Sequence, residues 1–252
     1  MLLCILTKIL KMEEKILKIY KNLGETPLEA LTRLRSEFPG YGDLPMTYAG
    51  RLDPMAEGEL LVLVGEECKK KDDYLGMDKE YEFEMLFGFK TDSYDLLGLS
   101  STGNFNKEDL ISSLAFILEN KKGKFIQKYP PFSSKTIKGI PLFKKTKDGD
   151  EYDAPEKEVE IYEISFLGLR EISGKDLFEE IKRRINLVNG DFRQEEILKK
   201  WEENLKGREE EIFSIAKVKM SCSSGTYVRS LVNSLSFPAV TFSIKRTRIF
   251  RI

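Results

Sequence analysis

Alternating polar and apolar residues recur along the chain and predict strands that bury one face in a sheet. The alternation marks residues 79–87, 158–165 and 215–221, and a further strand is predicted over residues 15–23. Residues 59–65 form a continuous apolar run, which is typical of a strand covered on both faces. We therefore expect a sheet assembled from segments that are far apart in the sequence.

Apolar residues at helical spacing lie between these strands. Residues 107–120 bring Leu110, Leu114 and Leu118 into line, which predicts a helix with one buried face. A second helix is predicted to begin at Thr26, because Thr26, Pro27 and Glu29 have the spacing of an N-cap, a first-turn proline and a capping box. The chain should therefore combine helices with the sheet.

Residues 174–211 are dense in charge and have a helical pattern. The apolar positions that define its two helical faces are Leu177, Ile181 and Ile185, followed by Ile197, Trp201 and Leu205. We interpret this segment as an excursion of two helices, packed on the core through Trp201.

Composition narrows the class of protein. With 41% hydrophobic and 33% charged residues in 252, the chain is typical of a soluble globular protein of one large or two small domains. Its three cysteines, Cys4, Cys68 and Cys222, are scattered, which favours a reducing cytoplasm. The chain has no histidine, which excludes histidine-based catalysis and histidine-ligated metals.

The apolar start of the chain, residues 1–10, is too short to span a bilayer, which takes roughly 20 residues. No membrane association is expected. We interpret residues 1–11 as an N-terminal extension or as a start assigned too early, with Met12 as the alternative initiator.

Charge is distributed unevenly although the net charge is only −1. Residues 121–149 carry nine lysines and one aspartate, and residues 216–252 carry seven Lys or Arg and no acid. Between them, residues 151–215 hold 18 acids against 11 bases. Two basic blocks and one acidic block suit an RNA-facing surface with the acidic segment turned away, and the alternative is a set of ordinary solvated faces.

A single carboxylate is prominent in the loop that precedes the strand at 59–65. Asp53 stands before Pro54, which biases it towards an extended conformation, and Gly50 and Gly58 flank the loop. These features predict a rigid loop that presents one acid. On physical grounds alone, an ordinary turn acid is an equally good interpretation.

The segment from Gly50 to Gly58 resembles the G-T-L-D-P-x-A-x-G signature of the TruB family of tRNA pseudouridine synthases. The resemblance continues over most of the chain. Residues 88–98 are similar to the family's G-x-x-T-D-T-x-D-x-x-G turn, residues 127–139 to its Q-x-P-P-x-x-S-A-x-K-x-x-G stretch, and residues 222–231 to its C-S-x-G-T-Y-I-R-x-L. The chain departs from the family at Tyr48, where most members have histidine, and at Asn22-Leu23, where a Lys-Pro pair is usual.

The resemblance implies roles for particular residues. Asp53 would be the nucleophile or a base, Arg229 would be its bidentate guanidinium partner, and Tyr81 would stack on the uracil base. Tyr227 would form a pocket wall. The predicted catalytic residues are thus Asp53, Tyr81 and Arg229, and the predicted substrate-binding residues are Tyr48, Arg51, Tyr227, Lys135 and Lys138.

The fold implied is α+β, a pseudouridine synthase fold with a mixed, largely antiparallel central sheet flanked by helices. Residues 12–252 would form the catalytic domain, with 174–211 as a helical insertion and without the C-terminal RNA-binding domain of many members. The implied activity is conversion of the T-loop uridine of tRNA, position 55, to pseudouridine by a cytoplasmic monomer, without cofactor or metal. Two alternatives stay open: a synthase acting on ribosomal RNA, and a non-catalytic protein that binds RNA or helps tRNA to fold.

Overall fold

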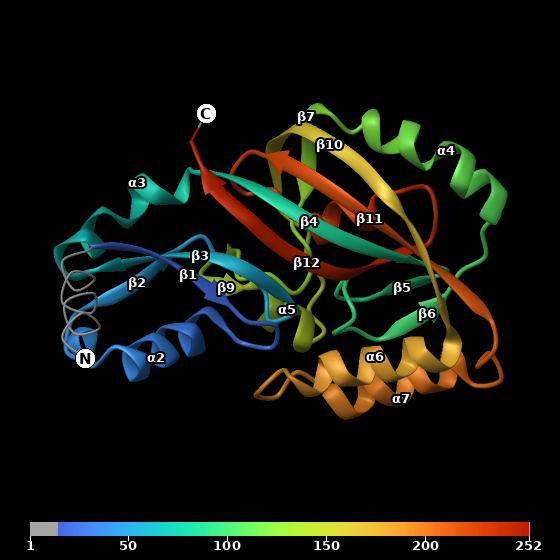
Figure 1. Ribbon diagram of the computed structural model, residues 1–252, viewed down its shortest axis with the longest axis horizontal. Coiled ribbons are helices and arrows are strands. Elements are labelled where there is room, and N and C mark those ends of the chain that lie inside the picture. Colours follow the sequence, from blue (N-terminus) through green and yellow to red (C-terminus); the bar gives the residue numbers. More distant parts are fainter. Residues whose placement is uncertain (1–14, 252) are drawn as a thin grey trace, which may run out of the picture.

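The computed structural model describes residues 15–251, which form one large sheet with helices on both faces (Figure 1). Its strands follow the order β1-β3-β12-β4-β11-β10-β7, and β2 pairs with β3. In this part of the chain, the β3–β12 pair is parallel and the other neighbours in the sheet are antiparallel. The predicted mixed, largely antiparallel sheet is confirmed. The strands of the sheet are β1 (Ile16–Lys21), β2 (Met46–Ala49), β3 (Ala56–Val64), β4 (Asp78–Phe87), β7 (Gly123–Lys128), β10 (Glu156–Ser173), β11 (Ile212–Cys222) and β12 (Ala239–Phe250).

Helices and two small hairpins complete the fold. The helices are α2 (Pro27–Glu37), α3 (Lys71–Leu75), α4 (Lys107–Glu119), α5 (Leu142–Lys147), α6 (Gly174–Asn186), α7 (Gln194–Leu205) and α8 (Val228–Asn233), with 3-10 turns η1 (Pro39–Tyr41) and η2 (Gly65–Lys70). The hairpins are β5 (Phe89–Thr91) with β6 (Ser100–Thr102), and β8 (Thr136–Ile137) with β9 (Ile140–Pro141). No helix within residues 15–251 is long and apolar enough to cross a membrane.

Local sequence signals account for where several elements begin. The Thr26 hydroxyl accepts a hydrogen bond from the amide of Glu29 at 3.2 Å, and the Glu29 carboxylate accepts one from the amide of Thr26 at 2.7 Å. This capping box satisfies two amides that the first turn of α2 leaves without helical partners. The predicted start of α2 is therefore confirmed, as is the predicted helix α4.

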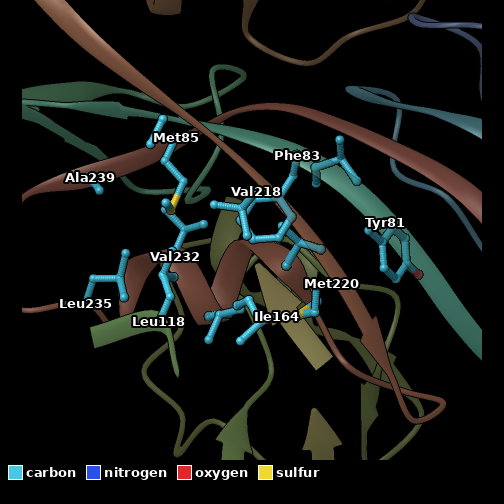
Figure 2. Packing of buried hydrophobic residues seen from close by; sticks show 14 of the residues in the cluster. Tyr81, Phe83, Met85, Leu118, Ile164, Val218, Met220, Val232, Leu235 and Ala239 are labelled. Carbon is cyan, nitrogen blue, oxygen red and sulfur yellow. The ribbon is translucent and has the colours of Figure 1, made fainter. Parts of the chain in front are cut away.

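The core lies on both faces of the sheet. On one face, α4 and α8 cover apolar residues of β4, β10 and β11, and Figure 2 shows these side chains interlocked around Phe83, Met85 and Val218. On the other face, α6 and α7 cover Leu86, Phe213 and Phe242. Neighbouring residues such as Met85 and Leu86 belong to opposite clusters because successive side chains of a strand point to opposite faces.

Strand β10 is much longer than the predicted 158–165, since it extends from Glu156 to Ser173. Its pairing with β11 shifts register between Ile161 and Glu163 and again between Phe166 and Gly168. Each shift interrupts the alternation of buried and exposed positions, so a period-two pattern cannot follow the strand past the second irregularity.

The helical excursion predicted from residues 174–211 is confirmed as the pair α6 and α7, which lie side by side in Figure 1. Trp201 is fully buried, as predicted, with its ring 5.2 Å from that of Phe89. Its indole nitrogen donates to the carbonyl oxygen of Leu96 at 3.1 Å. The interpretation of residues 1–11 lies outside the described residues.

Candidate active site

The Asp53 loop connects β2 to β3 and is held by buried groups on both sides. Leu52 and Met55 are buried on either side of Asp53, in the clusters on the two faces of the sheet. The amide of Ala56 donates to the carbonyl of Asp53 at 3.0 Å, and the amide of Gly24 donates to that of Pro54 at 2.9 Å. The loop thus leaves the Asp53 side chain partly exposed, with 32% of its surface accessible to solvent.

Two buried cations fasten this loop through its backbone carbonyls. Arg246 on β12 donates to the carbonyls of Gly50 and Arg51, both at 3.1 Å. Lys21 at the end of β1 donates to the carbonyl of Ala56 at 2.6 Å. Burial lowers the pKa of Lys21 to about 8, although the nearby carboxylates of Glu25, Asp53 and Glu57 oppose that shift.

Gly58 allows β12 to approach the loop closely. Its φ is +113°, and a Cβ built on it would lie 2.2 Å from the carbonyl oxygen of Arg246. Only glycine fits where β3 and β12 pair at this point, with Gly58 opposite Arg246. The second glycine of the motif therefore has a structural role, which keeps Arg246 within reach of the loop.

Arg229, the second residue of α8, is buried behind Asp53. Its Nε donates to Oδ2 of Asp53 at 2.8 Å. Its two terminal nitrogens donate elsewhere, NH1 to the carbonyl of Ser93 at 2.8 Å and NH2 to the carbonyl of Phe132 at 3.2 Å. The predicted pairing of Arg229 with Asp53 is present, but the prediction that it is bidentate is wrong, because NH1 and NH2 donate to backbone carbonyls and only Nε donates to Asp53.

Asp95 is a second carboxylate at this guanidinium that sequence reasoning did not assign to the site. Its Oδ2 lies 3.6 Å from Nε of Arg229, and its Oδ1 accepts from the Ser93 hydroxyl at 2.7 Å and the Leu97 amide at 3.0 Å. Burial raises the pKa of Asp95, against the lowering effect of Arg229. Burial alone would lower the pKa of Arg229, but Asp53 and Asp95 together raise it, so the guanidinium stays charged. The signal for Asp95 was its place in the 88–98 turn.

Tyr81 lies on β4 at the edge of the buried cluster, and in Figure 2 its hydroxyl points away from the other labelled side chains. It is 8% exposed. Burial raises the pKa of Tyr81 to about 12, while the neighbouring Arg246 opposes the shift. Tyr81 is therefore a neutral phenol near pH 7.

Tyr227 precedes α8 and, like Tyr81, lies near the charge of Asp53. Burial and then the charge of Asp53 raise the pKa of Tyr227 to about 12. Its ring meets that of Tyr129 edge-on, with centroids 5.4 Å apart. The buried Gln127 fixes its backbone, since the Tyr227 amide donates to Oε1 of Gln127 at 2.8 Å and Nε2 of Gln127 donates to the Tyr227 carbonyl at 3.1 Å.

The other predicted substrate-binding residues differ in how they relate to this centre. The ring of Tyr48 on β2 has Arg51 5.9 Å and Lys71 5.3 Å from its centroid, which forms a basic aromatic group where the Asp53 loop begins. Lys135 lies 5.3 Å from the ring of Tyr129 and so reaches the Tyr227 wall through that ring. Lys138 occupies the exposed β8–β9 turn, and no interaction among residues 15–251 joins it to the other site residues.

The site therefore consists of one partly exposed carboxylate, a permanently charged guanidinium behind it, two neutral phenols, and basic residues at the rim. A carboxylate so arranged can act as a nucleophile or as a base. Within residues 15–251, no cluster of Cys, Asp or Glu side chains is arranged to hold a metal ion.

Comparison with known proteins gives consistent matches. A family model described as TruB family pseudouridylate synthase (N terminal domain) matches residues 45–191. The proteins named tRNA pseudouridine synthase B from Borreliella afzelii and Borrelia garinii are 30% identical over 250 residues and 29% identical over 246 residues. The matches cover 96% of this chain and 72% of the first protein, and 94% of this chain and 70% of the second.

The fold is also found among solved structures. A chain of the crystal structure of a Cbf5-Nop10-Gar1 complex matches 96% of this chain with a TM-score of 0.55 and 16% identity. This chain covers 50% of that longer chain. The agreement extends to the arrangement of the sheet and helices, which is a likeness of fold.

Proposed function

The chain belongs to the TruB family of pseudouridylate synthases, and from this premise we propose that it converts the T-loop uridine of tRNA, the position numbered 55, to pseudouridine. The proposal that the substrate is a tRNA rests on the relatives named tRNA pseudouridine synthase B. The observation that carries the proposal is the 2.8 Å contact between Asp53 and Arg229, which joins two separate motifs that resemble those of the family, residues 50–58 and 222–231.

The reaction is an isomerisation that leaves the atom count unchanged. The bond from N1 of uracil to the ribose C1′ breaks, the base turns, and a new bond joins C5 to C1′. The proton on C5 is lost and N1 gains one, so no electrons are transferred to or from another molecule. One carboxylate beside the sugar is sufficient to begin it.

Asp53 supplies this carboxylate in our proposal, acting either on C1′ as a nucleophile or on the adjacent carbon as a base. Partial exposure of its side chain lets a substrate reach it, and the single hydrogen bond from Arg229 leaves Oδ1 unclaimed by that guanidinium. Arg229 places its positive charge beside the carboxylate and fixes the direction of that carboxylate. The target uridine must leave its stack to come within reach.

Tyr81 stacks on the displaced uracil in our proposal. A role as a general base at neutral pH would need a phenolate, and burial raises the pKa of Tyr81 to about 12. Tyr227 would close the opposite wall, while Tyr48, Arg51 and Lys135 would contact the RNA around the pocket. Lys138 at the exposed β8–β9 turn would meet a phosphate further away.

The test is to incubate the purified protein with unmodified tRNA and with ribosomal RNA and to map pseudouridine by base-specific chemical modification. We expect modification at the T-loop uridine of tRNA alone. Modification confined to ribosomal RNA would replace the substrate and keep the chemistry. RNA binding without pseudouridine in either substrate would indicate a non-catalytic protein and refute the proposal.

A further inference from the structure

The helical pair α6 and α7 touches the segment that carries Asp95, which the residue pattern of 174–211 did not foretell. Trp201 on α7 donates to the carbonyl of Leu96, and the Asn204 amide donates to the carbonyl of Ser100 at 2.9 Å. The loop between the two helices, residues 187–193, adds Arg193, which is the N-cap residue of α7. The expectation that the whole acidic block 151–215 is turned away from the site is therefore wrong, because Arg193, Trp201 and Asn204 contact residues 92–100.

The side chain of Arg193 makes two contacts, and each lies next to a carbonyl that accepts a hydrogen bond from Arg229. Its NH2 donates to Oδ2 of Asp92 at 2.9 Å, one residue before Ser93. Its guanidinium carbon lies 4.8 Å from the centroid of the Phe132 ring. The backbone oxygens of Ser93 and Phe132 are the acceptors for NH1 and NH2 of Arg229.

The surroundings of Arg193 hold it in this position. Its backbone has φ +64°, the left-handed conformation that side-chain-bearing residues seldom adopt. Next to it, Asp191 pairs with Lys147 of α5 at 2.6 Å, which ties the same loop to the basic segment that contains Phe132. Asp92, the partner of Arg193, also accepts a hydrogen bond from the amide of Leu99 at 2.8 Å. Its carboxylate therefore links Arg193 to the backbone that follows Asp95.

We infer that Arg193 is a positioning residue for the active site. It fastens the turn that connects β5 to β6, residues 91–99, to the segment around Phe132. Through these two segments it sets the positions of the two carbonyls that orient Arg229 against Asp53. Arg193 acts through other residues and need not touch the RNA. The kinetic test of this inference rests on the proposed function. Arg193 itself lies outside the motifs by which the sequence resembles the family.

The kinetic experiment measures kcat and KM of Arg193→Ala on tRNA. We expect kcat to fall about tenfold while KM changes less than about threefold, because chemistry is misaligned and the RNA surface is kept. Arg193→Lys retains the ion pair with Asp92 and should recover part of that loss. In a double-mutant cycle with Asp92→Asn, the two losses should not add, since both changes break one contact.

The matched control is Arg170→Ala. Arg170 also pairs with a carboxylate, Glu84 at 2.9 Å, and also lies over an aromatic ring, that of Phe242 at 5.3 Å. It belongs to β10 and touches none of the residues around Arg229 that the structure describes. Its removal should leave kcat and KM at wild-type values.

A second readout does not depend on activity. Hydrogen exchange should speed up at the amides of Leu97 and Leu99 in Arg193→Ala, because both donate to carboxylates of the 91–99 turn. In Arg170→Ala they should exchange as in the wild type. If the wild type makes no pseudouridine, the proposed function fails, and the exchange data still decide whether Arg193 holds the turn.

Three outcomes would overturn the inference. An unchanged kcat in Arg193→Ala would remove the positioning role. A raised KM with unchanged kcat would make Arg193 a direct RNA contact. Wild-type exchange at Leu97 and Leu99 would show that the turn keeps its shape without Arg193.

Discussion

Arg229 and Asp53 share a single hydrogen bond of 2.8 Å, made by Nε, while NH1 and NH2 of this guanidinium each donate to a backbone carbonyl. The arginine is consequently fixed from three directions, while the aspartate is fixed from one. This asymmetry keeps the cation stationary and leaves Oδ1 of the carboxylate without a hydrogen bond to that guanidinium. It also makes separate predictions for the two residues.

Asp53→Asn should reduce the rate of pseudouridine formation by at least about a thousandfold and leave RNA affinity within about threefold. The change removes a reactive carboxylate and preserves the shape of the side chain. The check combines single-turnover kinetics with a binding titration on the same tRNA. Multiple turnover by a preparation free of wild-type enzyme would contradict the role of Asp53.

Arg229→Lys should lower kcat about 10- to 100-fold, because an ammonium cannot direct donors along the three guanidinium directions at Asp53, Ser93 and Phe132. KM should change less than kcat. Steady-state kinetics on tRNA measure both, with Arg170→Lys as the control. Near-wild-type kcat would mean that a positive charge alone is enough at this position.

The buried ammonium of Lys21 predicts a stability difference that depends on pH. Burial lowers the pKa of Lys21 from 10.5 to about 8, so between these pH values the unfolded chain holds a proton that the folded protein lacks. The charged form costs stability below about pH 8, and the cost is relieved as pH rises towards 10.5. The gain over this window is on the order of 3 kcal/mol.

Urea unfolding of wild type and Lys21→Met, at steps from pH 7 to 10.5, tests this. The free energy of unfolding of the wild type should increase relative to that of Lys21→Met as pH rises. A difference that stays constant with pH would mean that Lys21 keeps an ordinary pKa in the folded protein. Other groups titrate in both proteins and cancel in the comparison.

Gly58→Ala should destabilise the fold by about 3 kcal/mol or more, because it adds a collision with the Arg246 backbone to a strained φ. Gly65→Ala is the matched control. Gly65 also has a positive φ, +63°, but a Cβ there would meet nothing within 4 Å, so only the backbone cost of about 1–2 kcal/mol applies. Thermal or chemical unfolding of the two variants gives the difference, and equal losses would rule out the collision.

The sequence predicted those features that depend on neighbouring residues. The capping box at Thr26 and the apolar faces of α6 and α7 are local patterns, and each appears in the structure as predicted. The contact between Asp53 and Arg229 was predicted only through the family resemblance, since 176 residues separate them.

The features that were not predicted depend on distant contacts. Asp95 reaches Arg229 because Ser93 and Leu97 turn its carboxylate inward, and no spacing rule reports that direction. Lys21 and Arg246 are ordinary cations in the sequence, and their burial follows from carbonyls of the Asp53 loop that need donors. Arg193 belongs to residues 151–215, which have a net negative charge. A net charge over a long segment does not indicate that one arginine in it pairs with Asp92.

The parallel pair of β3 and β12 has a consequence for biosynthesis. Strand β12 lies between β3 and β4, although both of those strands leave the ribosome long before it does. Until β12 is made, the nascent chain carries two open strand edges, and the Asp53 loop lacks the Arg246 donors. Ribosome-bound intermediates should therefore be inactive and prone to association through these edges, and the active centre is completed only when the last of these strands inserts.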